Sequence, residues 1–286
     1  MRYTFMRFPE GKAKCVTFSY DDVQKSDIRF SDMLQKYGIK CTFNINGAKF
    51  RNDSAHLTHD EIKKYIVDRG HEIAIHGYYH RATGNLRAIE GIRDVLDNRI
   101  ELEQEFDMII RGMAYPDSGI VYYSNPDYTY EKVKQYLTEL DIAYARNIIC
   151  DNNEFRLPLD WHDWRPTAHH KHTKIFDWID EFLNLDISES VYIAARKSRL
   201  FYVWGHSFEF NSNDNWDRGE EICKRLGGHD DIWYATNIEI YDYVKAFNSL
   251  IYSADGTKIY NPTLQTVWLD IDKKLYEIKS GETIKI

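Results

Sequence analysis

The first 247 residues alternate between short strand-like runs and longer amphipathic runs. Cys15 to Tyr20 has the apolar and aromatic character of a buried strand, and residues 26–37 after it have helical spacing. The same order recurs, with further strands expected over residues 40–45, 71–75, 108–114, 142–149, 199–204 and 232–235. Since parallel strands need helical crossovers between them, this alternation predicts an α/β fold, either an open sheet or a barrel.

The pattern changes after Phe247. Residues 248–286 contain short strand-like runs separated by turn residues such as Asp255-Gly256 and Gly281. We therefore expect two parts, a (β/α) barrel over residues 1–247 and a small antiparallel β appendage over residues 248–286 that packs on it. A length of 286 residues suits one large barrel with a short tail.

Composition excludes several classes of partner. With 37 Lys and Arg against 45 Asp and Glu, the net charge is −8, so the chain has no basic excess for nucleic acid. No apolar run is long enough for a transmembrane helix, and the first residues are too polar for a signal peptide. The four cysteines form no Cys-x-x-Cys pair and are expected to be buried, reduced thiols. These features favour a cytoplasmic protein, or a secreted one if a signal has been removed.

Unusual polar residues stand at the carboxyl ends of the expected strands. These segments are Asp21-Asp22, His76 to His80, Arg111 to Pro116, and Trp204-Gly205-His206. In α/β barrels the loops at the carboxyl ends of the strands converge over one face and form the active site. The sequence therefore predicts a functional site at that face.

His76 and His80 lie four residues apart, a spacing that brings two imidazoles to one side of a helical turn. A carboxylate from Asp21 or Asp22 would complete a site of two histidines and one carboxylate. Adjacent residues at a strand end point in different directions, so the other carboxylate would be free to act as a base. The alternative interpretations are a surface histidine pair and an acidic helix cap.

Three other segments have both a functional and a structural interpretation. Arg111 either holds the free aspartate ionised or forms an ion pair with a helix residue. His206 is either a proton donor or a buried, hydrogen-bonded histidine. Asp160 to Trp164 is either a sugar-facing surface or a loop that covers a core tryptophan. The run from His169 to His172 is at least as consistent with a solvated or substrate-lining loop as with a metal site.

Taken in order over roughly residues 14–207, these motifs resemble the polysaccharide deacetylase (NodB-homology, carbohydrate esterase family 4) superfamily. The family motif Thr-Phe-Asp-Asp is similar to Thr17 to Asp22, with two residues inserted before the aspartates. The resemblance implies that Asp21 is the base and Asp22 a metal ligand. The motif His-Ser/Thr-x-x-His is similar to His76 to His80 and implies that both histidines bind the metal.

The later motifs imply further roles. The match of Arg111 to Pro116 implies that Arg111 steadies the base and that the backbone near Tyr115 helps to hold the oxyanion. The match of Asp160 to Trp164 implies that Asp163 tunes the acid histidine and that Trp164 lines the pocket. The match of residues 204–206 implies that His206 is the general acid and that Trp204 lies against the acyl group.

Three positions depart from the family pattern: Val23 replaces a glycine, Gly77 a hydroxyl residue, and Trp204 a leucine. These departures leave the substrate open more than they affect the metal site.

The resemblance implies a distorted (β/α) barrel and a metal-dependent hydrolase that removes N- or O-linked acetyl groups from a carbohydrate. It implies one divalent metal ion, with zinc expected first and Co, Ni, Mn or Fe as alternatives. The expected partner is an acetylated saccharide. The competing functions are an allantoinase-like hydrolase of cyclic amides within the same superfamily and a non-catalytic carbohydrate-binding protein.

Overall fold

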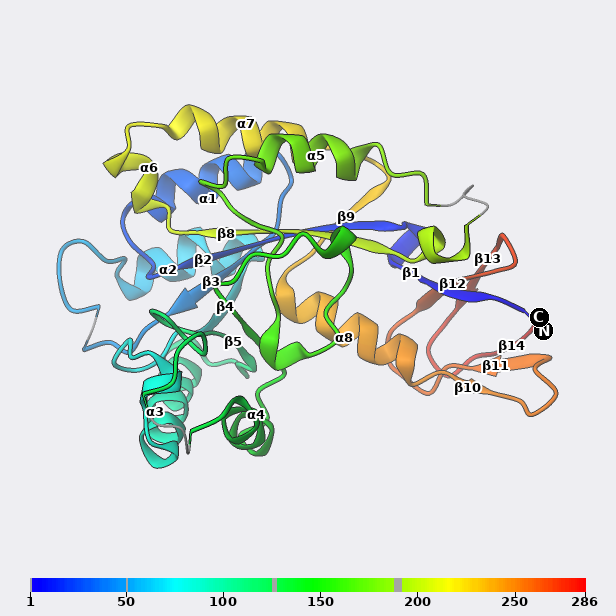
Figure 1. Ribbon diagram of the computed structural model, residues 1–286, viewed down its shortest axis with the longest axis horizontal. Coiled ribbons are helices and arrows are strands. Elements are labelled where there is room, and N and C mark those ends of the chain that lie inside the picture. Colours follow the sequence, from blue (N-terminus) through cyan, green and yellow to red (C-terminus); the bar gives the residue numbers. More distant parts are fainter. Residues whose placement is uncertain (1, 50, 125–127, 188–191) are drawn as a thin grey trace.

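The centre of the fold is a curled sheet of parallel strands in the order β6-β5-β4-β3-β2-β8-β7 (Figure 1). The structure is a computed structural model, and it describes residues 2–49, 51–124, 128–187 and 192–286. A further strand, β9, pairs with β2 alongside this path. The strands of this sheet are β2 (Lys14–Asp21), β3 (Cys41–Ile45), β4 (Glu72–Ile75), β5 (Gly112–Ala114), β6 (Tyr144–Arg146), β7 (Ala168–His169), β8 (Arg199–Gly205) and β9 (Ile232–Tyr234).

Helices cover both faces of this sheet, and Figure 1 shows α1, α5 and α7 grouped on one side and α3 and α4 on the other. All eight residues of β2 are buried, including polar ones such as Thr17, Ser19 and Asp21. Helix α2 begins with a capping box, in which the Thr58 side chain accepts from the backbone N–H of Glu61. The helices are α1 (Ser26–Lys36), α2 (His59–Tyr65), α3 (Ala88–Phe106), α4 (Tyr130–Glu139), α5 (Ile175–Leu183), α6 (Phe208–Ser212), α7 (Trp216–Leu226) and α8 (Asn237–Asn248).

The appendage consists of two small antiparallel sheets, β1-β12-β13 and β10-β11-β14. It has its own apolar core, which includes Leu250, Ile259 and Leu269. Its strands are β1 (Thr4–Arg7), β10 (Ile251–Tyr252), β11 (Lys258–Tyr260), β12 (Val267–Ile271), β13 (Lys274–Ile278) and β14 (Thr283–Lys285).

The expected division at residue 247 is wrong for the amino-terminal segment, because β1 pairs with β12 and so belongs to the appendage. Periodicity could not reveal this, since a strand's partner is not encoded in its own pattern. A buried carboxylate, Asp270, lies where the appendage meets the barrel. It accepts from Arg7 at 2.9 Å and from Arg196, beside the barrel, at 2.6 Å. Because Arg7 itself belongs to β1, the ion pair of Asp270 with Arg196 is the one that ties the appendage to the barrel.

Helix α1 carries a buried carboxyl group, Asp27, whose pKa is raised by burial to about 7. Because the folded state favours the protonated acid, this group contributes stability that is full below about pH 4 and is lost as the pH rises through about 7. Between pH 5 and pH 8 the free energy of unfolding should fall by roughly 2 to 3 kcal/mol less in the Asp27→Asn variant than in the wild type. Urea unfolding at both pH values measures this difference.

Asp32→Asn is the matched control, since Asp32 lies on the same helix with a side chain that is 60% exposed. It should leave the pH dependence as in the wild type. An equal loss of stability in Asp27→Asn and in the wild type would contradict this account.

Candidate metal and acid-base site

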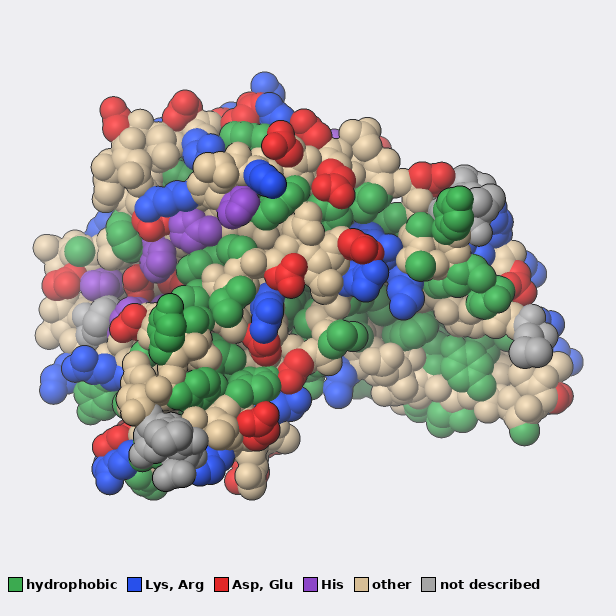
Figure 2. All heavy atoms as spheres, viewed as in Figure 1, with side chains coloured by type: hydrophobic (Ala, Val, Ile, Leu, Met, Phe, Trp, Pro, Cys, Tyr) green, Lys and Arg blue, Asp and Glu red, His purple; other side chains and the backbone are tan. Residues whose placement is uncertain are grey.

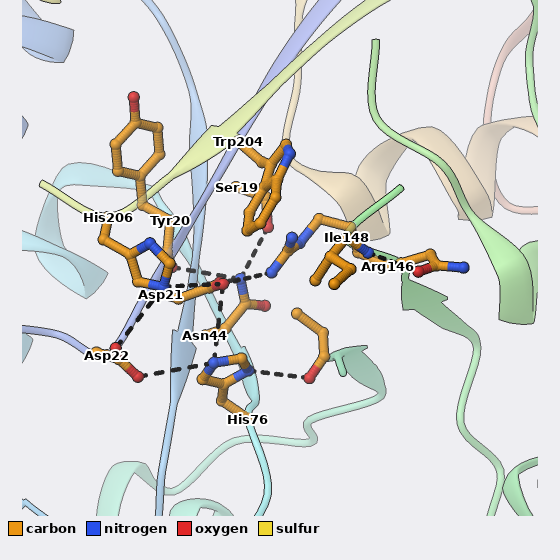
Figure 3. Close-up of polar contacts among 12 residues, drawn as sticks. Ser19, Tyr20, Asp21, Asp22, Asn44, His76, Arg146, Ile148, Trp204 and His206 are labelled. Atoms are coloured by element: carbon orange, nitrogen blue, oxygen red, sulfur yellow. Dashed lines mark hydrogen bonds and ion pairs between the residues drawn. The ribbon is translucent and has the colours of Figure 1, made fainter. Parts of the chain in front are cut away.

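The carboxyl ends of β2, β4 and β8 bring four of the expected residues together (Figure 3). Asp21 ends β2 and Asp22 follows it, while His76 and His206 each come directly after a strand. His80 joins them from the loop after β4, with its ring centroid 5.0 Å from that of His76. Figure 2 shows histidine side chains gathered with acidic and basic ones on one face of the molecule.

Asp22, His76 and His80 have the geometry of a metal site, with one ligand atom from each lying within 4.8 Å of the others. Asp22 Oδ1 is 3.7 Å from His76 Nε2 and 3.6 Å from His80 Nε2. Metal–ligand bonds of about 2.0–2.2 Å in a tetrahedron place neighbouring ligand atoms roughly 3.4 Å apart. Asp22 Oδ1 is also buried without a hydrogen-bond partner. A divalent ion would satisfy that oxygen, so these residues fit one.

The tautomer of His76 suits a metal ligand. Its Nδ1 lies 3.0 Å from the carbonyl oxygen of Ala114, which can only accept, so Nδ1 carries the proton. In the neutral ring the lone pair is then on Nε2, which faces Asp22. Metal-binding histidines commonly donate their other ring N–H in this way.

Helix α3 braces the loop that carries these histidines. Asn98 Oδ1 accepts from the backbone N–H of His76 at 3.1 Å, and Asp94 Oδ1 accepts from that of Tyr79 at 2.8 Å. Gly77 has φ +74°, and a Cβ there would lie 2.5 Å from Asp94 Oδ2, so the site requires glycine. Sequence reasoning missed Asp94 and Asn98; their signal is two polar residues, four apart, on the buried side of an amphipathic helix.

Asp21 is a buried carboxylate held by two donors. Arg146 Nη2 donates to its Oδ2 at 2.5 Å and Asn44 Nδ2 to its Oδ1 at 2.7 Å. Burial alone would raise the pKa of Asp21, but the charge of Arg146, followed by those of His76 and His206 and the Asn44 hydrogen bond, lowers it to about 2. Asp21 is therefore ionised at neutral pH.

The expectation that Arg111 steadies Asp21 is wrong. Arg111 precedes β5, at the amino end of that strand and hence at the opposite edge of the sheet from the site. It forms a two-pronged ion pair with Asp242 of α8, at 2.6 and 2.9 Å, which is the structural alternative considered for it. The arginine on Asp21 is Arg146, which sequence reasoning missed although it is the one charged residue in residues 142–149.

The two residues before the aspartates form no bulge in β2. Strand β2 pairs without a bulge with both neighbours as far as Tyr20, and Asp21 stands opposite Asn44. Ser19-Tyr20 therefore stand directly before the two aspartates. Asp22 and Val23 follow with φ of +75° and +50°. A β-branched residue is strained in that region, where a glycine would not be, so Val23 keeps a backbone turn that the family pattern fills with glycine.

His206 points its Nε2 at both aspartates, 3.8 Å from Asp21 Oδ2 and 3.8 Å from Asp22 Oδ2. Burial lowers its pKa, but Glu209, Asp21 and Asp22 outweigh that effect and raise the pKa overall.

The expectation that Asp163 tunes His206 is wrong. Asp163 accepts from Asn147 at 2.6 Å and pairs with Arg165 at 2.9 Å, because its short 3₁₀ turn directs it there.

Two expected substrate-binding residues, Tyr115 and Trp164, are instead core residues. Tyr115 is fully buried; its backbone N–H donates to the Arg146 carbonyl at 3.0 Å, so it is not available to an oxyanion, and its hydroxyl donates to the His162 carbonyl. Trp164 packs edge-on against aromatic rings that include Tyr202, which is the alternative of a covered core tryptophan.

Trp204, by contrast, lies at the site. Its ring is 4.4 Å from the guanidinium carbon of Arg146, as Figure 3 shows.

Part of the chain matches a known protein family. Residues 9–140 match the family model for polysaccharide deacetylase. The expected resemblance to the polysaccharide deacetylase superfamily is confirmed over this segment. The matched segment holds the first strands of the barrel with both aspartates and the two histidines of the candidate metal site. The expected NodB-type barrel is confirmed.

Several solved structures are similar to this chain at low sequence identity. A putative polysaccharide deacetylase from Mycobacterium smegmatis is 16% identical, with a TM-score of 0.56, over 87% of this chain and 96% of that one. A chitin deacetylase from Colletotrichum lindemuthianum is 14% identical, with a TM-score of 0.49, over 82% and 89% of the chains. A pseudoenzyme of carbohydrate esterase family 4 from Bacillus anthracis is 15% identical, with a TM-score of 0.46, over 83% and 68%.

A search among curated proteins gave no match. Within the described part of the chain, no helix combines the length and the apolar character needed to cross a bilayer.

Proposed function

We propose that this protein is a metal-dependent hydrolase that removes N- or O-linked acetyl groups from a carbohydrate. The observation that carries the proposal is the position of Asp21, ionised and held by Arg146, beside the Asp22–His76–His80 group and His206. A carbohydrate-binding protein has no need of a base, an acid and a metal site at one point. The match of residues 9–140 to the polysaccharide deacetylase family model supports the same reaction.

Asp22, His76 and His80 would hold one divalent ion, with zinc the first candidate and Co, Ni, Mn or Fe the others. Such an ion supplies Lewis-acid chemistry to the water and the acyl oxygen. Asp21 accepts a proton from the attacking water, while Arg146 and Asn44 keep its carboxylate ionised and oriented.

His206 donates the proton that the departing amine or hydroxyl requires, from the Nε2 that faces the aspartates. Trp204, beside Arg146, offers an aromatic surface to the acyl group or to a sugar ring.

The test is acetate release from a panel of N-acetylated and O-acetylated sugars, before and after chelation and with each candidate metal restored. We expect acetate release that chelation abolishes, and Asp21→Asn should lower it by about 100-fold because no other base is in place. The exposed Asp32→Asn variant should behave as the wild type.

Two results would reject this function. Ring opening of allantoin or another cyclic amide without acetate release would assign the protein to the related amide hydrolases. Sugar binding without turnover by the metal-loaded protein would make it a binding protein.

A further inference from the structure

A second group of polar side chains surrounds Glu209, on the short helix that follows His206. Lys171 Nζ donates to Glu209 Oε1 at 2.7 Å. The Nε2 atoms of His169 and His170 lie 3.3 and 3.0 Å from Glu209 Oε2. Burial raises the pKa of Glu209, but these neighbours and His206 hold it far below its usual range, so Glu209 is an anion.

The hydrogen bonds of His169 identify the group as proton donors around an anion. The backbone N–H of Lys171 donates to His169 Nδ1 at 3.1 Å, so Nδ1 is an acceptor and carries no proton. In the neutral ring the proton is therefore on Nε2, which faces Glu209. This arrangement is the reverse of His76, whose protonated Nδ1 leaves Nε2 free for a metal. Tyr20 Oη lies 3.1 Å from Nδ1 of His170, and because a hydroxyl can donate or accept there, this contact leaves the tautomer of His170 open. The residue types would suit a metal, but the proton positions favour a buried carboxylate.

His206 connects this group to the reaction site. Its Nε2 faces Asp21 and Asp22, and its Nδ1 is buried without a hydrogen-bond partner in the structure. The Oε1 of Glu209 lies 3.9 Å from that Nδ1, and both belong to the segment that leaves β8. Catalytic hydrogen bonds are often long in the free enzyme and shorten when substrate binds.

We propose that Glu209 is the positioning residue for His206: it accepts the Nδ1 proton and so directs the Nε2 proton to the leaving group. Glu209 thereby takes the role expected for Asp163, and the run His169-His170-Lys171 serves to hold its carboxylate in place. The protons balance, since doubly protonated His206 gives its Nε2 proton to the departing nitrogen or oxygen and becomes neutral, with the proton on its Nδ1 donated in a hydrogen bond to Glu209. This inference rests on the proposed function of His206 as the acid.

The test compares two substrates for Glu209→Gln. The donors around Glu209 share its two carboxylate oxygens, whereas a glutamine offers them only one acceptor oxygen. The orientation of His206 should therefore be lost. For an acetylated sugar we expect kcat to fall about 100-fold with KM unchanged, because its leaving group needs a proton. For 4-nitrophenyl acetate, whose leaving group needs none, we expect less than about a threefold loss. Glu209→Asp should recover part of the sugar activity.

His172→Ala is the matched control, because His172 belongs to the same run but stacks on Trp178 away from Glu209. It should leave both reactions unchanged. An equal loss on both substrates in Glu209→Gln, or no loss on either, would overturn the proposal.

A second readout is independent of activity. Nitrogen-15 NMR of the metal-loaded protein should show His206 protonated at Nδ1 in the wild type. In Glu209→Gln the proton should be redistributed between the two ring nitrogens. The wild-type result alone supports the role of Glu209 even if no acetyl group is ever released, so failure of the function and failure of this inference are distinguishable. A His206 that is unprotonated at Nδ1, or a second bound metal ion that Glu209→Gln removes, would overturn the proposal.

Discussion

An Arg146→Met variant is expected to be about 3–5 kcal/mol less stable than the wild type and to release acetate roughly 100-fold more slowly. Arg146 is fully buried and Asp21 is 3% exposed, so the substitution leaves an uncompensated carboxylate in the interior. Without the neighbouring charge, burial raises the pKa of Asp21, and less of the base is ionised at neutral pH. Urea unfolding and steady-state kinetics measure the two effects.

Arg111→Met is the matched control. Arg111 also forms a close ion pair, with Asp242, but both side chains are 34% exposed, and such pairs contribute about 0–1 kcal/mol. If Arg146→Met is too unstable to assay, Arg146→Lys keeps the charge but loses the planar donor geometry, and it should have intermediate activity. Equal effects of the two methionine variants would contradict the assignment of Arg146 to the base.

The second large effect is expected at His76. His76→Ala should bind its divalent ion much more weakly and lose roughly 10⁴-fold in acetate release, since Lewis-acid stabilisation is worth several kcal/mol and each 1.36 kcal/mol is tenfold. Metal content by atomic absorption, alongside acetate release, measures both. His80→Ala should give the same loss with less effect on folding, because its side chain is 25% exposed and that of His76 only 2%.

His59→Ala on α2 is the control, with an exposed histidine outside the site, and it should keep both metal and activity. Full metal content in His76→Ala together with full activity would show that Asp22, His76 and His80 are not the metal site.

The local pattern of the sequence was enough to predict the parallel sheet and the meeting of Asp21, Asp22, His76 and His206 at one edge. It was not enough to choose between Arg111 and Arg146, because the choice depends on where a three-residue strand begins. Arg111 lies one residue before β5, and Arg146 is the last residue of β6. A shift of a few residues therefore moves a side chain from one edge of the sheet to the other.

The partner of His206 could not be predicted for a related reason. Asp163 matched a motif by spacing, but its direction is set by Asn147 and Arg165, which contact it in space. Glu209 stood only three residues after His206. The fixed turn into α6 brings it beside His206 and the run from His169, and spacing along the sequence does not specify that turn.

The pairing of β1 with β12 has a consequence for how the chain folds as it is synthesised. Arg7 leaves the ribosome long before its partner, since Asp270 lies 263 positions later. The strands of the parallel sheet lie within residues 14–234, so the barrel is complete while β1 still has no strand to join. Because domains fold as units during synthesis, the first strand emerges early and docks last. Arrested nascent chains that end before β12 should therefore protect the barrel from protease while leaving the amino terminus open to cleavage.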